Sequence, residues 1–208
     1  MKLMLLISVC FFLTFLNGSV LFARPDSLKH CISFGYYKDL SDTYGGGSYY
    51  FSGEYELSTS WYGLNFDFGL YQSQSTFKYI FIIDEINESV EIPVEEMAIM
   101  KMGSISGLIK PIQKKWLEID ILFGAAFGKA NHSMFSSLEY TYNTAESKLT
   151  SVTRDYMLIS KNHFGYKAGM NATFFVTRKF GIQVKTRMSD LSNGGTFFLL
   201  GGGFAFKF

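Results

Sequence analysis

Apolar and polar residues alternate with a period of two along most of the chain after residue 24. In the segment 180–188, for example, Ile182 and Val184 share one face, while Gln183 and Lys185 share the other. Successive side chains of a β-strand point to opposite faces, so this pattern predicts strands with one apolar face. Four segments show it clearly: 61–71, 117–128, 163–174 and 180–188.

Four further segments complete a set of eight predicted strands. They are 30–37, 49–57, 97–109 and 196–208. Residues 97–109 are apolar but alternate poorly, so the register of this strand cannot be assigned from the pattern. No helical periodicity competes after residue 24, and the chain is predicted to have an all-β fold.

The first 23 residues have the features of a secretory signal peptide. Lys2 precedes an uncharged apolar stretch at 3–16, and small or turn-forming residues then lead to Ala23, after which we expect cleavage. The alternative is an N-terminal membrane anchor, but the stretch is shorter than the roughly 20 residues that a spanning helix needs. We therefore predict a signal peptide at 1–23, export through the inner membrane, and one domain at 24–208.

Composition excludes several classes of protein. The chain is 48% hydrophobic, 18% aromatic and 18% charged, which does not fit a disordered chain. Its longest uncharged run after the N-terminus, 191–206, is too short for a spanning helix and contains five glycines. A formal net charge of +1 gives no reason to expect nucleic-acid binding.

Alternation alone does not decide whether the apolar faces are buried in a soluble sandwich or barrel, or face lipid in a membrane barrel. The glycines favour the membrane barrel, because the polar faces carry ten of them and the apolar faces only Gly53 and Gly202. Glycine weakens a water-facing strand, whereas the narrow interior of an eight-stranded barrel needs small residues. The ten are Gly35, Gly63, Gly69, Gly124, Gly128, Gly165, Gly169, Gly181, Gly201 and Gly203. We therefore predict an eight-stranded antiparallel up-and-down transmembrane β-barrel.

The connections between the predicted strands alternate between short and long. Short ones lie at 58–60, 110–115 and 177–179, and long ones at 38–48, 72–96, 130–156 and 189–195. This alternation is typical of the periplasmic turns and extracellular loops of outer-membrane barrels. The two longest connections also contain strand-like segments, which predicts that their hairpins extend beyond the membrane. These segments are 77–83, 89–94, 134–142 and 148–159.

The last residues, Gly-Phe-Ala-Phe-Lys-Phe208, place aromatic residues at alternate positions up to Phe208. Together with the eight strands, this ending resembles the small eight-stranded outer-membrane β-barrels of Gram-negative bacteria, the broad group that includes OmpA-like barrels and the OmpX/Ail type. The resemblance covers residues 29–208. It implies an outer-membrane location among lipids, and recognition of Phe204, Phe206 and Phe208 by the barrel assembly machinery. No motif of a particular subfamily is present, so no specific activity follows from the resemblance.

Acidic and basic residues of the predicted interior lie on different strands, so they can meet across the lumen. The acids are Glu54, Glu56, Asp67, Glu118 and Asp120, and the bases are Lys167, Lys185, Arg187 and Lys207. Because buried charges need partners, one interpretation is that these residues neutralise each other and plug the barrel. The other is a narrow pore whose salt bridges rearrange.

No catalytic, cofactor or metal site is predicted. The segment 189–194 is similar to the His-x-Ser-Asn segment of outer-membrane lipid A deacylases, but Asp190 stands where the histidine would activate Ser192. The run Asp-Leu-Ser-Asn-Gly is more typical of a turn, and lipid A hydrolysis stays an alternative. The candidate ligands His132, His163 and the single mature cysteine Cys31 show no metal-binding spacing.

The long connections are candidate binding surfaces for an extracellular protein or a host-surface ligand. The segment 72–96 carries six acidic residues against Lys78 and interleaves them with branched apolar residues. Strands that protrude from a barrel offer edges on which a partner can add a strand. The segment 130–156 is the second candidate. The alternative is that both are solvated surface loops without a partner.

Overall fold

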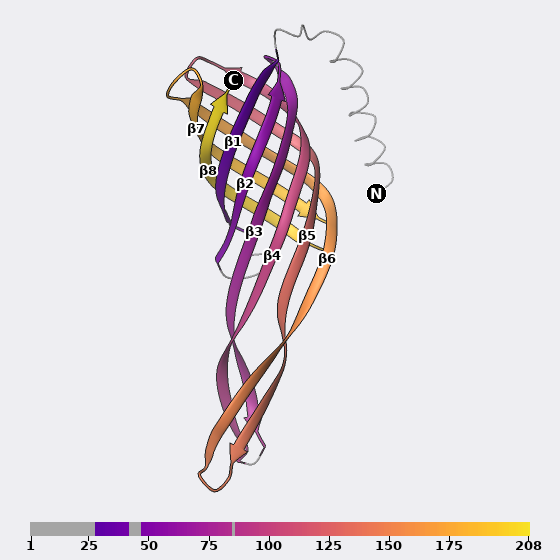
Figure 1. Cartoon of the computed structure of the whole chain (residues 1–208), viewed down its shortest axis with the longest axis vertical. Helices are drawn as coiled ribbons and strands as arrows, with labels where there is room; N and C mark the ends of the chain where they lie inside the picture. The colour runs from indigo at the N-terminus through magenta and orange to yellow at the C-terminus, as the bar shows by residue number, and fades with distance from the viewer. Residues whose placement is uncertain (1–27, 42–46, 85) are drawn as a thin grey trace.

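The protein forms a closed barrel of eight antiparallel strands, each paired with its neighbours in sequence (Figure 1). This computed structural model describes residues 28–41, 47–84 and 86–208, and the predicted signal peptide at 1–23 lies outside the described residues. The strands are β1 (Lys29–Asp39), β2 (Gly47–Ser58), β3 (Tyr62–Ile83), β4 (Glu88–Gln113), β5 (Leu117–Asn143), β6 (Lys148–Phe175), β7 (Phe180–Leu191) and β8 (Gly195–Lys207). The ring closes where β1 pairs with β8, which confirms the predicted up-and-down barrel. Among the described residues, no helix is long and apolar enough to cross a membrane.

The two ends of the barrel differ. At one end the strands are joined by tight turns, and the C-terminus lies at this end (Figure 1). The turn predicted at 110–115 is shorter than expected, because β4 continues to Gln113. At the opposite end, β3–β4 and β5–β6 continue far beyond the barrel as two hairpins (Figure 1).

The long hairpins correct part of the loop prediction. Among the described residues, β3 pairs with β4 alone beyond Gln74, and β5 pairs with β6 alone beyond Ser133. The segments 72–96 and 130–156 are therefore largely strand, so their prediction as loops is wrong, while the predicted extension of the hairpins is confirmed. The hairpin turns lie between Ile83 and Glu88 and between Asn143 and Lys148.

The two hairpins pack against each other through a shared apolar cluster, called the hairpin core below. The β3–β4 hairpin buries Phe81, Ile83, Ile92 and Val94 in it. The β5–β6 hairpin contributes Phe135, Leu138, Tyr140, Tyr142, Leu149 and Val152. The rings of Phe81 and Tyr140 lie 5.3 Å apart between centroids, and the Asp84 amide donates a hydrogen bond to the Tyr140 hydroxyl at 3.2 Å. The hairpins therefore form one folded unit.

Along the barrel wall, apolar side chains point outward and most polar ones inward. Phe68, Phe123 and Phe164 are 62%, 59% and 69% exposed on the outer face. Pairing all around the ring satisfies the backbone polar groups without water, as hydrocarbon requires. An apolar outer surface of this extent is unfavourable in water and favourable in lipid. The protein is therefore a transmembrane barrel, as the distribution of glycines predicts.

Candidate functional site

Ion pairs fill the middle of the barrel interior. On β2, Glu54 Oε1 lies 3.0 Å from Lys185 Nζ, and Glu54 Oε2 lies 3.0 Å from Arg187 Nη2, both cations coming from β7. The Tyr37 hydroxyl of β1 donates a further hydrogen bond to Glu54 Oε1 at 2.8 Å. All these side chains are buried. One carboxylate thus serves two cations, which makes it the centre of this group.

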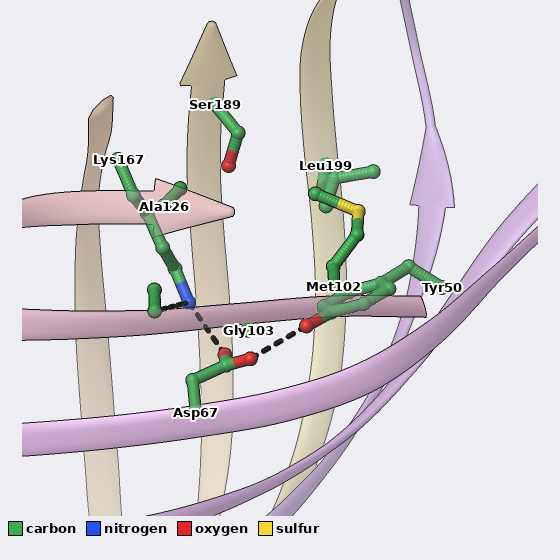
Figure 2. Close-up of a pocket in the computed structure, with 9 residues that line it drawn as sticks. Tyr50, Asp67, Met102, Gly103, Ala126, Lys167, Ser189 and Leu199 are labelled. Atoms are coloured by element: carbon green, nitrogen blue, oxygen red, sulfur yellow. Dashed lines mark hydrogen bonds and ion pairs between the residues drawn. The ribbon is translucent and has the colours of Figure 1, made fainter. Parts of the chain in front are cut away.

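A second ion pair lies at Asp67 of β3 (Figure 2). Asp67 Oδ2 accepts a hydrogen bond from Lys167 Nζ of β6 at 2.5 Å, and Asp67 Oδ1 accepts one from the Tyr50 hydroxyl, also at 2.5 Å. Lys167 Nζ also donates to Ser104 Oγ at 3.1 Å. The cavity beside these residues has a volume of about 10 Å³, which is room for about one water molecule. The interior is therefore nearly filled at this level.

A third group of charges surrounds Lys110 of β4, nearer the end with the tight turns. Lys110 Nζ lies 2.5 Å from Glu56 Oε1 and 3.5 Å from Asp120 Oδ1, and it also pairs with Glu118. The ammonium group of Lys207, on β8, pairs with the other carboxylate oxygen of Glu118. These ion pairs therefore connect β4 with β8 on the opposite side of the ring through Glu118 of β5.

The structure places all nine predicted interior charges inside the barrel and adds Lys110. Lys110 is absent from the predicted set because 110–115 was expected to form a turn, whereas it continues the alternation of β4 and points inward. With Lys110, five bases lie among these five acids, and a sixth buried acid, Asp39 of β1, accepts a hydrogen bond from Tyr71. An unpaired buried charge is costly, and these ion pairs offset the cost of burying the charges inside the barrel.

Large apolar side chains occupy the interior toward the hairpins, which the sequence pattern does not predict. This cluster, called the lumen core below, comprises Tyr37, Tyr50, Tyr71, Met100, Met102, Ala126, Ala130, Leu191, Phe197 and Leu199. The rings of Tyr71 and Phe197 pack edge to face with centroids 4.9 Å apart. The Tyr71 hydroxyl donates a hydrogen bond to Asp39 Oδ2 at 2.8 Å. The available signal in the sequence was the run of tyrosines on otherwise polar faces, since a tyrosine can pack its ring and still bond to a carboxylate.

The segment 189–194 ends β7 and turns toward β8. His163 is buried beside this turn, and its Nδ1 lies 3.1 Å from the main-chain oxygen of Ser192. Because the imidazole contacts the backbone rather than the hydroxyl, these two residues do not form a nucleophile–base pair. The Asp190 carboxylate accepts a hydrogen bond from Thr196 at 3.1 Å. Within residues 28–41, 47–84 and 86–208, no group of three or more His, Cys, Asp or Glu residues is placed to hold a metal ion.

The sequence matches no protein-family model and has no significant match among curated proteins. Several solved structures are similar. Ail of Yersinia pestis, in complex with the heparin analogue sucrose octasulfate, is 16% identical with a TM-score of 0.53, over 88% of this chain and 99% of Ail. Neisserial surface protein A is 10% identical with a TM-score of 0.53, over 88% and 97%. OprG from Pseudomonas aeruginosa is 8% identical with a TM-score of 0.54, over 86% and 95%.

The fold is that of the small eight-stranded outer-membrane β-barrels. A closed barrel with a lipid-facing apolar wall is the form in which proteins cross the outer membrane, and the barrel accordingly lies there. In this outer-membrane barrel, Phe204 and Phe206 are exposed on the outer wall of β8, and Phe208 is exposed at the chain end. These residues occupy the lipid-facing surface at the end with the tight turns, and their recognition by the assembly machinery stays a prediction.

Proposed function

We propose that this outer-membrane barrel is a closed anchor that presents the two packed hairpins at the cell surface for interaction with another protein. The hairpin core carries the proposal, because a solvated loop without a partner needs no buried apolar cluster of its own. Short turns of outer-membrane barrels face the periplasm and long connections face the outside, so the hairpins are extracellular. Export through the signal peptide at 1–23 and insertion guided by the terminal aromatic residues belong to the same proposal.

Each hairpin has an edge strand that is bonded on one side. Among the described residues, β3 is bonded to β4 beyond Gln74, and β6 is bonded to β5 before Phe164. An extended segment of a partner can add to such an edge through main-chain hydrogen bonds. On β3, Ile80 and Ile82 are 59% and 56% exposed, so a partner on this edge also gains apolar contact.

The charge of the β3–β4 hairpin restricts the class of partner. Residues 72–96 contain six acids and one cation, Lys78, which pairs with Glu91 at 2.7 Å. Such a surface favours a basic or neutral segment and repels a polyanion. Sucrose octasulfate, the compound bound in the Ail structure, is a polyanion. We therefore propose a protein partner with a basic or neutral extended segment for this hairpin.

Shortening the β3–β4 hairpin should remove attachment and leave the barrel folded. In this variant an Asn-Gly turn replaces residues 77–94 and joins Thr76 to Glu95, which are directly paired in the ladder. Cells that display the variant should lose most of their binding to surfaces coated with extracellular-matrix proteins, because the acidic edge is gone. Binding is measured by counting attached cells, and folding by the change in gel mobility between unboiled and boiled samples.

The matched control shortens the β5–β6 hairpin in the same way. An Asn-Gly turn replaces residues 136–155 and joins the paired residues Phe135 and Tyr156. Both variants lose the hairpin core, but only the first loses the acidic edge. A larger loss of attachment in the first variant supports the proposed edge, and unchanged attachment in both variants would contradict the proposed function.

The filled interior leads us to expect that the barrel does not conduct. Purified protein in planar bilayers should show no steady openings, because the ion pairs and the lumen core fill the space between the strands. A variant with Tyr71→Ala and Phe197→Ala tests whether the lumen core or the layer of ion pairs closes the lumen. The barrel of this variant should also show no steady openings, because the ion pairs remain. Steady openings of nanosiemens size in the unmodified protein would favour the second candidate, a narrow pore.

A further inference from the structure

Two lysines face each other on the outer wall of the barrel. Lys101 of β4 and Lys129 of β5 occupy directly paired positions, and both side chains are exposed on the outward face. Like charges at directly opposed positions of a sheet repel each other and destabilise it. An anion that binds both ammonium groups would remove this repulsion.

The neighbouring positions of the wall supply no such anion. On its other side Lys101 pairs with Leu70 of β3, and Lys129 pairs with Asn162 of β6. Along the two strands, the adjacent positions on the same face are Ile99, Gly103, Phe127 and Asn131. All six neighbours are uncharged, so an anion that binds both ammonium groups would come from outside the barrel wall.

The lysine pair lies where the apolar band of the wall ends. Toward the hairpins, the apolar outward run is interrupted by a polar residue at Lys38 on β1, Gln72 on β3, Lys101, Lys129 and Asn162 on β6, and on β4 the apolar Ile99 and Met97 follow Lys101. The outward residues one step nearer the tight turns are Tyr36, Leu70, Gly103, Phe127 and Phe164. This border between apolar and polar positions marks the level of the lipid headgroups in the leaflet on the hairpin side.

An apolar surface lies next to the two lysines on the side of the tight turns. A Cβ atom on Gly103 would come within 2.4 Å of the Phe127 ring, so the ring covers the glycine. Phe127 is 47% exposed, and its outer surface is open to lipid. The wall therefore offers two cations at the headgroup level and an apolar surface immediately beneath them.

We propose that Lys101 and Lys129 together bind a phosphate group of an outer-leaflet lipid whose acyl chains lie along the exposed ring of Phe127. The two ammonium groups and the apolar surface beside them fit a molecule in which a phosphate is joined to hydrocarbon. A free phosphate ion has no hydrocarbon part to contact the apolar surface. The site faces the membrane rather than the solvent around the hairpins, so it is independent of the proposed protein partner.

The test measures lipid binding to the purified full-length barrel by native mass spectrometry. The probes are lipid A with two phosphates, the same lipid after enzymatic removal of both phosphates, and inorganic phosphate as a competitor. Attraction to an anionic lipid surface is about fivefold in affinity per lysine, so the variant K101Q/K129Q should bind phosphorylated lipid A about thirtyfold more weakly. The dephosphorylated lipid should bind the wild type and the variant equally.

The matched control is Lys38→Gln, an outward lysine at the same border whose paired neighbours are Tyr49 and Leu200. It should weaken the binding of phosphorylated lipid A by no more than about fivefold, the effect of one lysine near an anionic lipid surface. The proposal is overturned if K101Q/K129Q keeps wild-type affinity, if Lys38→Gln loses as much, or if inorganic phosphate displaces the lipid at equal concentration.

A stability measurement gives a second test, because the difference in urea resistance between the wild type and the variant should change sign between two media. In neutral detergent, K101Q/K129Q should resist urea better than the wild type, because the repulsion is removed. With phosphorylated lipid A present, the order should reverse, because the wild type alone binds the lipid tightly. The same order in both media would also overturn the proposal.

Discussion

Replacing Glu54 by glutamine should destabilise the barrel by about 3–5 kcal/mol, as the removal of one partner from a buried ion pair does. The substitution keeps the shape of the side chain but leaves Lys185 and Arg187 buried without their carboxylate, which lies 3.0 Å from each. Burying a charge without a partner is unfavourable, and both cations are buried, with Lys185 0% and Arg187 1% exposed. The measurement is urea unfolding of the protein refolded into lipid vesicles, followed by tryptophan fluorescence and by gel mobility.

Glu91→Gln is the matched control for Glu54→Gln. It removes the carboxylate of an exposed pair with Lys78, in which the side chains are 52% and 77% exposed, so its cost should be about 0–1 kcal/mol. A double-mutant cycle with Arg187→Met isolates the coupling, because the second substitution should cost less once Glu54 is gone. Equal losses for Glu54→Gln and Glu91→Gln would show that the interior charges are not held as ion pairs.

Much of the fold follows from local sequence pattern. A strand with one face toward lipid and the other in a narrow lumen must alternate, and this made seven of the eight registers readable. The strand lengths were readable only in part. The alternation of apolar and polar residues ends where the hairpins leave the membrane, although strand-like segments there predict that the hairpins extend further. There Phe81 is buried in the hairpin core, while Ile80 and Ile82 on the other face are apolar and exposed.

The interior was harder to predict because its contacts join distant strands. β4 has Met100 inside and Ile99 outside, so both faces are apolar, and its register depends on pairing with β3 and β5. The nine predicted interior charges comprise five acids and four bases, but this difference does not point to Lys110, because Asp39 is a further buried acid. The lumen core gave little signal, since its residues are apolar on a face where polar residues are expected.

Replacing Gly124 by alanine should destabilise the barrel by about 3 kcal/mol, the upper part of the usual range for overpacking. A Cβ at this inward position of β5 would lie 2.0 Å from the carbonyl oxygen of Ile105 and 2.4 Å from the Cα of Ser106. Both atoms belong to the backbone of β4, so no side-chain rotation relieves the contact and the two strands must separate. Urea unfolding in lipid vesicles measures the loss.

Gly107→Ala is the control for Gly124→Ala, because it lies on the outer face one position along the same pair of strands. The nearest atom to its Cβ would be the Phe123 carbonyl oxygen at 3.8 Å, so the methyl group fits. Glycine weakens a strand interior by about 0.5–1 kcal/mol relative to alanine, so this variant should be slightly more stable than the wild type. Stability changes of opposite sign in the two variants would show that, at this pair of strands, a methyl group fits on the outer face and not on the inner face. If Gly124→Ala unfolds like the wild type, crowding of the interior does not require glycine there, and the distribution of glycines does not indicate which face of a strand lies inside.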